Sequence, residues 1–92
     1  MMHDRLPSDE GTYVVTTRTG TTYVFDLALL TVTRIPGPTS QPDMHDGTRR
    51  LRSIVQCQIG ESGYWTMQPD ESDVEFYWQL TTPIVAIEDA IG

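Results

Sequence analysis

The sequence of 92 residues contains no lysine, one cysteine and two histidines. The lone cysteine, Cys57, cannot form an internal disulfide, whereas small domains of oxidising compartments usually carry several. No apolar run approaches the ~20 residues that span a bilayer, and residues 1–10 lack the apolar core of a signal peptide. We therefore expect a soluble cytoplasmic protein that is neither secreted nor inserted into a membrane.

Positive charge is also scarce. All six basic residues are arginines, and they face 13 Asp and Glu residues, so the formal net charge is −7. Phosphate backbones repel such a chain, and proteins that bind nucleic acid usually carry a basic patch. Direct binding of DNA or RNA is therefore not expected.

Groups that carry catalysis or bind metals are few. Neither His3 nor His45 has a nucleophile and an orienting acid in a recognisable arrangement. Asp43, His45 and Asp46 match no zinc-ligand spacing, and zinc sites normally use more thiolates or imidazoles. Cys57 is expected to face the core as a small packed residue. The sequence thus predicts a non-enzymatic protein with no cofactor and no metal.

The apolar residues that are present fall in short runs rich in β-branched and aromatic types, which are typical of strands. Two such runs, from Tyr13 to Leu27, flank a turn at Thr19-Gly20. A three-residue loop, 18–20, places the larger apolar residues on one face, namely Tyr13, Val15, Tyr23, Phe25 and Leu27. A two-residue loop would mix polar and apolar residues on both faces. We predict the three-residue loop, with Gly20 at the position that needs a positive φ.

Three further segments continue the β pattern. A tight connection at 26–30 is followed by a strand that ends before Pro36, because proline lacks an amide donor for the ladder. The loop at 36–48 contains three prolines and hardly any apolar residue. The next strand, 51–59, alternates and is expected to turn these residues inward: Leu51, Ser53, Val55, Cys57 and Ile59.

The last third of the chain predicts a second hairpin. Its strands are expected at 64–68 and 74–80, with an inward face of Val74, Phe76, Trp78 and Leu80 and an outward face of Glu75, Tyr77 and Gln79. A short final strand at 84–87 follows Pro83. We expect it at a sheet edge, where it could pair with its copy in a homodimer.

These elements predict one all-β domain over residues 12–89, between a flexible N-terminal arm (1–11) and a C-terminal tail (90–92). A chain of this length buries only about 60–65% of its unfolded surface, which leaves room for one core. Six to seven short strands then favour a small antiparallel barrel or a strongly twisted sheet with no long helix. Five residues are expected to meet in the interior: Val15, Phe25, Val55, Phe76 and Trp78.

Arginine and aromatic residues in the second half indicate a surface that binds another protein, because both types are enriched at interface hot spots. The candidate binding residues are Arg49, Arg50, Arg52, Tyr64, Trp65 and Tyr77. A solvated surface that blunts sheet edges is the alternative explanation. Another alternative is that carboxylates at 70–75 and 88–89 mimic nucleic acid and block a DNA-binding protein.

Two blocks resemble short uncharacterised proteins of actinobacteria and their bacteriophages. They are TTRTGTTYVFDLALLTVTRIPG, residues 16–37, and LTTPIVAIE, residues 80–88. The shared elements are Thr-Gly turns, a strand ending in Asp-Leu, and Thr-Thr-Pro before a final apolar strand. The resemblance implies an accessory protein that binds and modulates a host protein in the host cytoplasm, and it supplies no active residues.

Overall fold

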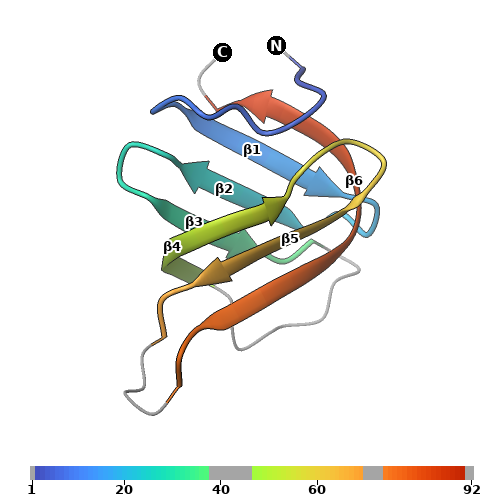
Figure 1. Ribbon diagram of the computed structural model, residues 1–92. Helices are drawn as coiled ribbons and strands as arrows, with labels where there is room; N and C mark the ends of the chain where they lie inside the picture. The colour runs from blue at the N-terminus through green and yellow to red at the C-terminus, as the bar shows by residue number, and fades with distance from the viewer. Residues whose placement is uncertain (1, 38–46, 70–73, 91–92) are drawn as a thin grey trace.

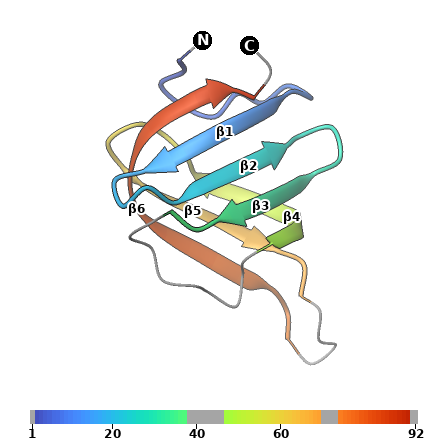
Figure 2. The ribbon, with the colours of Figure 1, turned by 180° about the vertical axis from the view of Figure 1, so that it is seen from behind.

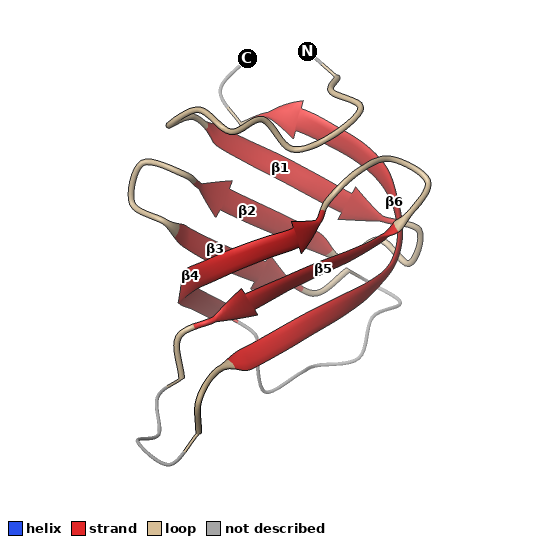
Figure 3. Ribbon diagram, viewed as in Figure 1, coloured by secondary structure: helices blue, strands red, loops and turns tan. Residues whose placement is uncertain are grey.

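The computed structural model describes residues 2–37, 47–69 and 74–90. In this part of the chain there is no helix, and six antiparallel strands close into a barrel in the order of the sequence (Figures 1 and 3). The prediction of a small all-β barrel is confirmed. The strands are β1 (Thr12–Thr17), β2 (Thr22–Asp26), β3 (Thr31–Ile35), β4 (Gly47–Gln56), β5 (Ser62–Met67) and β6 (Tyr77–Asp89).

The hairpin of β1 and β2 has the register that the sequence predicts. Tyr13 lies opposite Phe25 and Val15 lies opposite Tyr23, and all four side chains are buried. The Gly20 amide donates to the Thr17 carbonyl at 2.9 Å, and Gly20 has a φ of 88°. The loop at 18–20 is thus the three-residue type, closed by a glycine in the left-handed region.

The connection from β2 to β3 is a tight turn fixed by Asp26. Its carboxylate Oδ1 accepts hydrogen bonds from the amides of Ala28 and Leu29 at 3.1 and 3.0 Å. A short side-chain acceptor of this kind holds a turn without a helix. β3 then follows and stops at Ile35, directly before Pro36, as predicted. Figure 2 shows β1, β2 and β3 side by side.

The two longest strands, β4 and β6, each change their pairing partner along their length. β4 pairs with β3 over residues 47–50 and with β5 from Leu51 onward. β6 pairs with β5 as far as Pro83 and with β1 from Ile84 onward. Proline has no amide to donate, and Pro83 sits at this change of partner.

The loop predicted at 36–48 ends earlier than expected, because residues 47 and 48 already belong to β4.

Residues 77–80 of the strand predicted at 74–80 and the whole of the strand predicted at 84–87 belong to one strand, β6. It has β5 on one side and β1 on the other, so its second half is not an edge. The prediction of an edge there is wrong. A homodimer formed by pairing this segment with its copy has no free edge to use.

Trp65 occupies the centre of the core. It is fully buried, and its ring meets those of Tyr23 and Phe25 edge to face, at centroid distances of 4.9 and 4.8 Å. Gly63 makes room for this ring, because a Cβ built there would lie 2.5 Å from a Trp65 ring carbon. Cys57 is also buried, as predicted.

The inward face of the first half of β6 is the opposite of the predicted one. Tyr77 and Gln79 are 9% and 8% exposed, whereas Trp78 and Leu80 are 55% and 57% exposed. Side chains directly opposite each other in a ladder share a face. Gln79 lies opposite Trp65 and Tyr77 opposite Met67, and both partners fill the core. The partners on β5 therefore fix which face of β6 is buried.

The alternation predicted for β4 also fails in part. Leu51 is buried as expected, but Val55 is 62% exposed and Ser53 is exposed as well. The ladder between β4 and β5 shifts register between Leu51 and Ser53 and again between Ile54 and Gln56. Each bulge adds one unpaired residue and so breaks the period of two.

Only two of the five residues expected to meet in the interior, Val15 and Phe25, are fully buried there. Phe76 is half-buried just before β6 begins. Val55 and Trp78 lie outside, for the reasons given above.

The N-terminal arm is attached to the barrel, which differs from the flexible arm expected for residues 1–11. The His3 amide donates to the Ile87 carbonyl at 2.8 Å, and the Leu6 amide donates to the Cys57 carbonyl at 2.9 Å. Leu6 also packs against the core cluster. The arm therefore bridges the end of β6 and the segment that follows β4.

Candidate functional site

The outer face of β5 and β6 carries three apolar side chains, Tyr64, Trp78 and Leu80, which we call the outer patch. Tyr64 lies directly opposite Leu80 in the ladder, and the rings of Tyr64 and Trp78 meet edge to face at 6.5 Å. Together the three side chains line a hollow of about 250 Å³. Trp78 and Leu80 each expose more than half of their surface to solvent.

Leaving these groups in water has a cost that a binding partner would remove. Apolar surface contributes about 25 cal/mol for every Å² taken out of water. Scattered apolar residues on a surface need no explanation, but aromatic and aliphatic groups that cluster around a hollow are typical of a recognition surface. The outer patch has this character.

The six predicted binding residues are divided between the core and the surface. Trp65 is in the core and Tyr77 is buried, so neither can be a surface anchor, and both predictions are wrong. Tyr64 is half-buried and belongs to the outer patch.

The three predicted arginines lie along β4. Arg50 is exposed, opposite Thr31 of β3. Arg49 lies over the Tyr77 ring at 4.7 Å, and Arg52 lies over the Phe76 ring at 4.8 Å. A guanidinium over an aromatic face is held by the ring quadrupole. Arg52 is thereby fixed beside the residues that lead into the outer patch along β6.

A second hollow, which we call the β4 groove, has a volume of about 520 Å³. Residues of β4, of the arm and of the turn from β2 to β3 line the groove. Figure 1 shows where these three segments lie in the barrel. Its apolar lining includes Leu6, Pro7, Leu27, Leu30, Leu51 and Val55. Ligand pockets typically measure about 300–1,000 Å³, so the groove has room for a ligand.

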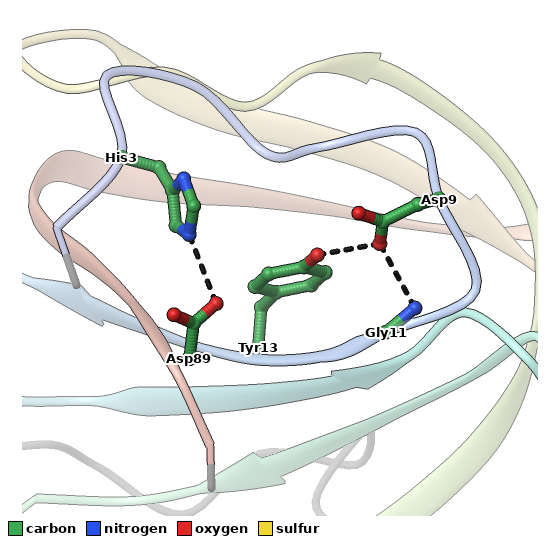
Figure 4. Close-up of polar contacts among 5 residues, drawn as sticks. All are labelled: His3, Asp9, Gly11, Tyr13 and Asp89. Atoms are coloured by element: carbon green, nitrogen blue, oxygen red, sulfur yellow. Dashed lines mark hydrogen bonds and ion pairs between the residues drawn. The ribbon is translucent and has the colours of Figure 1, made fainter. Parts of the chain in front are cut away.

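A polar cluster holds the arm against β1 and β6 (Figure 4). The His3 Nε2 and Asp89 Oδ1 atoms are 3.0 Å apart, and the Tyr13 hydroxyl donates to Asp9 Oδ1 at 2.5 Å. The Gly11 amide donates to the same Asp9 oxygen at 2.9 Å. The His3 ring meets the Tyr13 ring edge to face at 5.4 Å.

These contacts change the proton affinity of three groups. The hydrogen bond to Asp9 raises the pKa of the Tyr13 hydroxyl to about 12. Hydrogen bonds from Tyr13 and Gly11 lower the pKa of Asp9, and the hydrogen bond from His3 lowers the pKa of Asp89. In the described structure no hydroxyl or thiol is hydrogen-bonded to His3. The cluster therefore attaches the arm to the barrel and does not have the arrangement of a catalytic triad.

No protein-family model, curated protein or solved structure matches the chain. The surfaces described above are thus the basis for any functional assignment.

The remaining chemical groups offer little for catalysis. Burial raises the pKa of the Cys57 thiol to about 12, so the reactive thiolate is scarce at neutral pH. Within residues 2–37, 47–69 and 74–90, no three His, Cys, Asp or Glu residues gather to hold a metal ion, and no helix is long and apolar enough to cross a membrane. Asp43, His45, Asp46 and the carboxylates at 70–73 lie outside the described residues.

Trp78 and Leu80 are the surface residues that the sequence analysis missed. Its period of two placed them in the core. The sequence does offer the opposite inward face for this strand. It consists of the alternating residues Tyr77, Gln79 and Thr81, which are one aromatic residue and two with side chains that can form hydrogen bonds. All three are buried.

Proposed function

We propose that the protein is a non-enzymatic interaction module that binds another protein through the outer patch. The observation that supports this is the exposure of Trp78, 55%, beside Tyr64 and Leu80 in a shared hollow. Tryptophan and tyrosine dominate binding hot spots, and an anchor of this kind gains most when the partner excludes water around it.

We further propose that the partner is a host protein and that the protein acts in the host cytoplasm. The support is the resemblance of residues 16–37 and 80–88 to short actinobacterial and actinobacteriophage proteins. The formal net charge of −7 favours a partner whose rim is basic, since complementary charge speeds encounter.

Affinity capture from the native cytosol tests this function. Tagged protein is compared with its Trp78→Ala and Leu80→Ala variants, and bound proteins are measured by mass spectrometry. Trp78→Ala should weaken capture of one specific partner by at least about tenfold, as expected for a lost hot spot of about 2 kcal/mol. Val85→Ala is the matched control, because Val85 is an exposed apolar residue of the same strand outside the patch.

Two results would contradict the proposal. One is a folded wild-type protein that captures no specific partner, and the other is a Trp78→Ala variant that captures it as well as the wild type.

Mimicry of nucleic acid by carboxylates remains the alternative, and the same capture separates it. Association driven by carboxylates should weaken steeply as salt rises, whereas association through the outer patch should persist. The structure gives mimicry little support at 88–89, because the Asp89 carboxylate is already hydrogen-bonded to His3.

A further inference from the structure

We infer that the β4 groove binds an extended peptide, which adds to β4 as a short additional strand. This site is separate from the outer patch, because it lies on the edge of β4 that faces away from β5. The inference goes beyond the proposed function, since it assigns a second binding surface with a ligand of a different kind.

The backbone of β4 defines what kind of ligand fits. Up to residue 50, β4 has β3 on this edge, and the Leu51 amide still donates to the Leu30 carbonyl at 2.7 Å. From Cys57 the arm takes over, with the Leu6 amide bonded to the Cys57 carbonyl. Between these two points, residues 52–56 have β5 as their only strand neighbour in the described structure.

An edge of this kind is a template for strand addition. Extended backbone that lacks a neighbour offers amide and carbonyl groups, and an incoming peptide can pair with them. The open stretch spans about 20 Å between Leu51 and Cys57, at roughly 3.3 Å for each residue. A peptide of about five residues fits this length.

The apolar lining provides for the side chains of such a peptide. Alternate residues of a strand point to the same side, so every second side chain of the peptide would point toward the floor of the groove. That floor reaches the buried residues Leu51 and Cys57. Apolar residues at alternate positions are therefore the expected pattern.

Charged residues of the lining favour particular end residues in the peptide. Arg5 is bridged to Gln58 at the end where β4 finishes. Glu10 lies at the opposite end, next to Gly11, whose carbonyl accepts the Leu27 amide. Arg52 also lines the groove at this end, but its guanidinium lies over the Phe76 ring. All strand neighbours in the barrel are antiparallel, and a peptide antiparallel to β4 would begin near Arg5 and end near Glu10. An acidic first residue and a basic last residue complement these charges.

The test uses the full-length protein and the peptide Asp-Val-Thr-Val-Lys with acetylated and amidated ends. Amide chemical shifts and hydrogen exchange of the ¹⁵N-labelled protein are followed by NMR as the peptide is added at millimolar concentration. We expect shifts at residues 52–56 and in the arm, together with slower amide exchange within 52–56. A peptide that leaves these amides unchanged would overturn the inference.

Two variants of this peptide test the mode of binding. A peptide with alternate N-methylated amides should bind at least about tenfold more weakly, because each backbone hydrogen bond contributes about 0.5–1.5 kcal/mol. The charge-reversed peptide Lys-Val-Thr-Val-Asp should bind several-fold more weakly than the parent. Equal binding of the N-methylated peptide would show that the groove takes apolar side chains without strand addition and would overturn the inference.

Protein variants separate the groove from the outer patch. Val55→Asp places a charge in the apolar lining at an exposed position and should abolish peptide binding while the fold persists. Trp78→Ala should bind the peptide like the wild type, even though it loses the partner of the outer patch. If Trp78→Ala loses the peptide, or if the 52–56 signals of the free protein shift with its own concentration, the occupant is not a peptide in the β4 groove, and the inference fails.

Discussion

The first three strands and the last three strands of the barrel follow the strand period of two to different extents. In β1 and β2 the buried residues alternate without interruption, and each cross-strand pair of the hairpin is in one register. In β4 and β6 the alternation is broken by bulges and by a change of partner within each strand. Alternation therefore predicts burial where a strand keeps the same neighbours along its length, and it fails where the neighbours change or a bulge intervenes.

The two tryptophans provide the strongest contrast within this comparison. Both lie in the second half, but Trp65 is fully buried and Trp78 is mostly exposed. Trp65→Ala should cost about 3–5 kcal/mol of unfolding free energy, as expected for a large aromatic ring deleted from a core. Trp78→Ala should change stability by no more than about 0.5 kcal/mol. Chemical denaturation of both variants measures these values.

Fluorescence provides a check that needs no mutation. Acrylamide should quench about half of the tryptophan emission, from Trp78, and leave that of Trp65. A large loss of stability in Trp78→Ala, or quenching of both tryptophans, would show that the inverted face of β6 is wrong.

Glycines from the two halves should respond to substitution for different reasons. In Gly63→Ala the new Cβ would meet the Trp65 ring at 2.5 Å and crowd Thr81, whose hydroxyl accepts the Gly63 amide at 2.8 Å. Overpacking of this kind costs about 1–3 kcal/mol. Thermal unfolding measures the loss, and the double variant Gly63→Ala with Trp65→Ala should lose less than the sum of the two single changes. An additive double variant would argue against this contact.

Gly20 in the first half should depend on backbone conformation alone. Nothing lies within 4 Å of a Cβ built there, but its φ of 88° is costly for other residues. Gly20→Ala should therefore lose about 1–2 kcal/mol. Gly20→Asn should lose less, because asparagine enters the left-handed region more readily. Denaturation midpoints compare the two, and equal losses would indicate that the loop at 18–20 does not require this conformation.

The same comparison explains how far the sequence could predict the molecule. The barrel class, the loop at 18–20, the Asp26 turn and the burial of Cys57 all follow from local chemistry, because each depends on residues close together in the chain. The exposure of Trp78 depends on its partners across β5, and that of Val55 on bulges in β4. The spacing of apolar residues within one strand does not determine the register in which it pairs with a strand distant in the sequence.

The candidate surfaces were predicted less well for a related reason. Tyr64 and the exposed arginines of β4 were recognised by residue type, but Trp65 and Tyr77 were placed outside when both are buried. The β4 groove depends on where the arm lies, and the arm has too few apolar residues for a pattern to place it. Its position is set by contacts between residues far apart in the chain, such as His3 and Asp89, which are separated by 86 residues.

The arm joins the two halves, and pH should loosen it with an effect smaller than those of the substitutions above. Because the pKa values of Asp9 and Asp89 are lowered in the folded protein, their contacts contribute fully above the ordinary aspartate value of 3.8. That contribution is lost as the pH falls through the lowered values. The amides of His3 and Leu6 bond to β6 and to Cys57 just after β4, and their protection factors against hydrogen exchange should therefore fall in acid before the barrel unfolds.

At high pH the opposite sign applies to Tyr13. Its raised pKa means that its bond to Asp9 contributes below the ordinary tyrosine value of 10.0 and is lost as the pH rises toward 12. Tyr13→Phe should remove this alkaline effect and leave the acid response of Asp89, whereas Asp89→Asn should remove the latter. Glu10→Gln, beside Asp9 on the exposed arm, is the matched control and should retain both. Identical pH profiles in all four proteins would mean that the polar cluster does not hold the arm, and the wall of the β4 groove would then need another support.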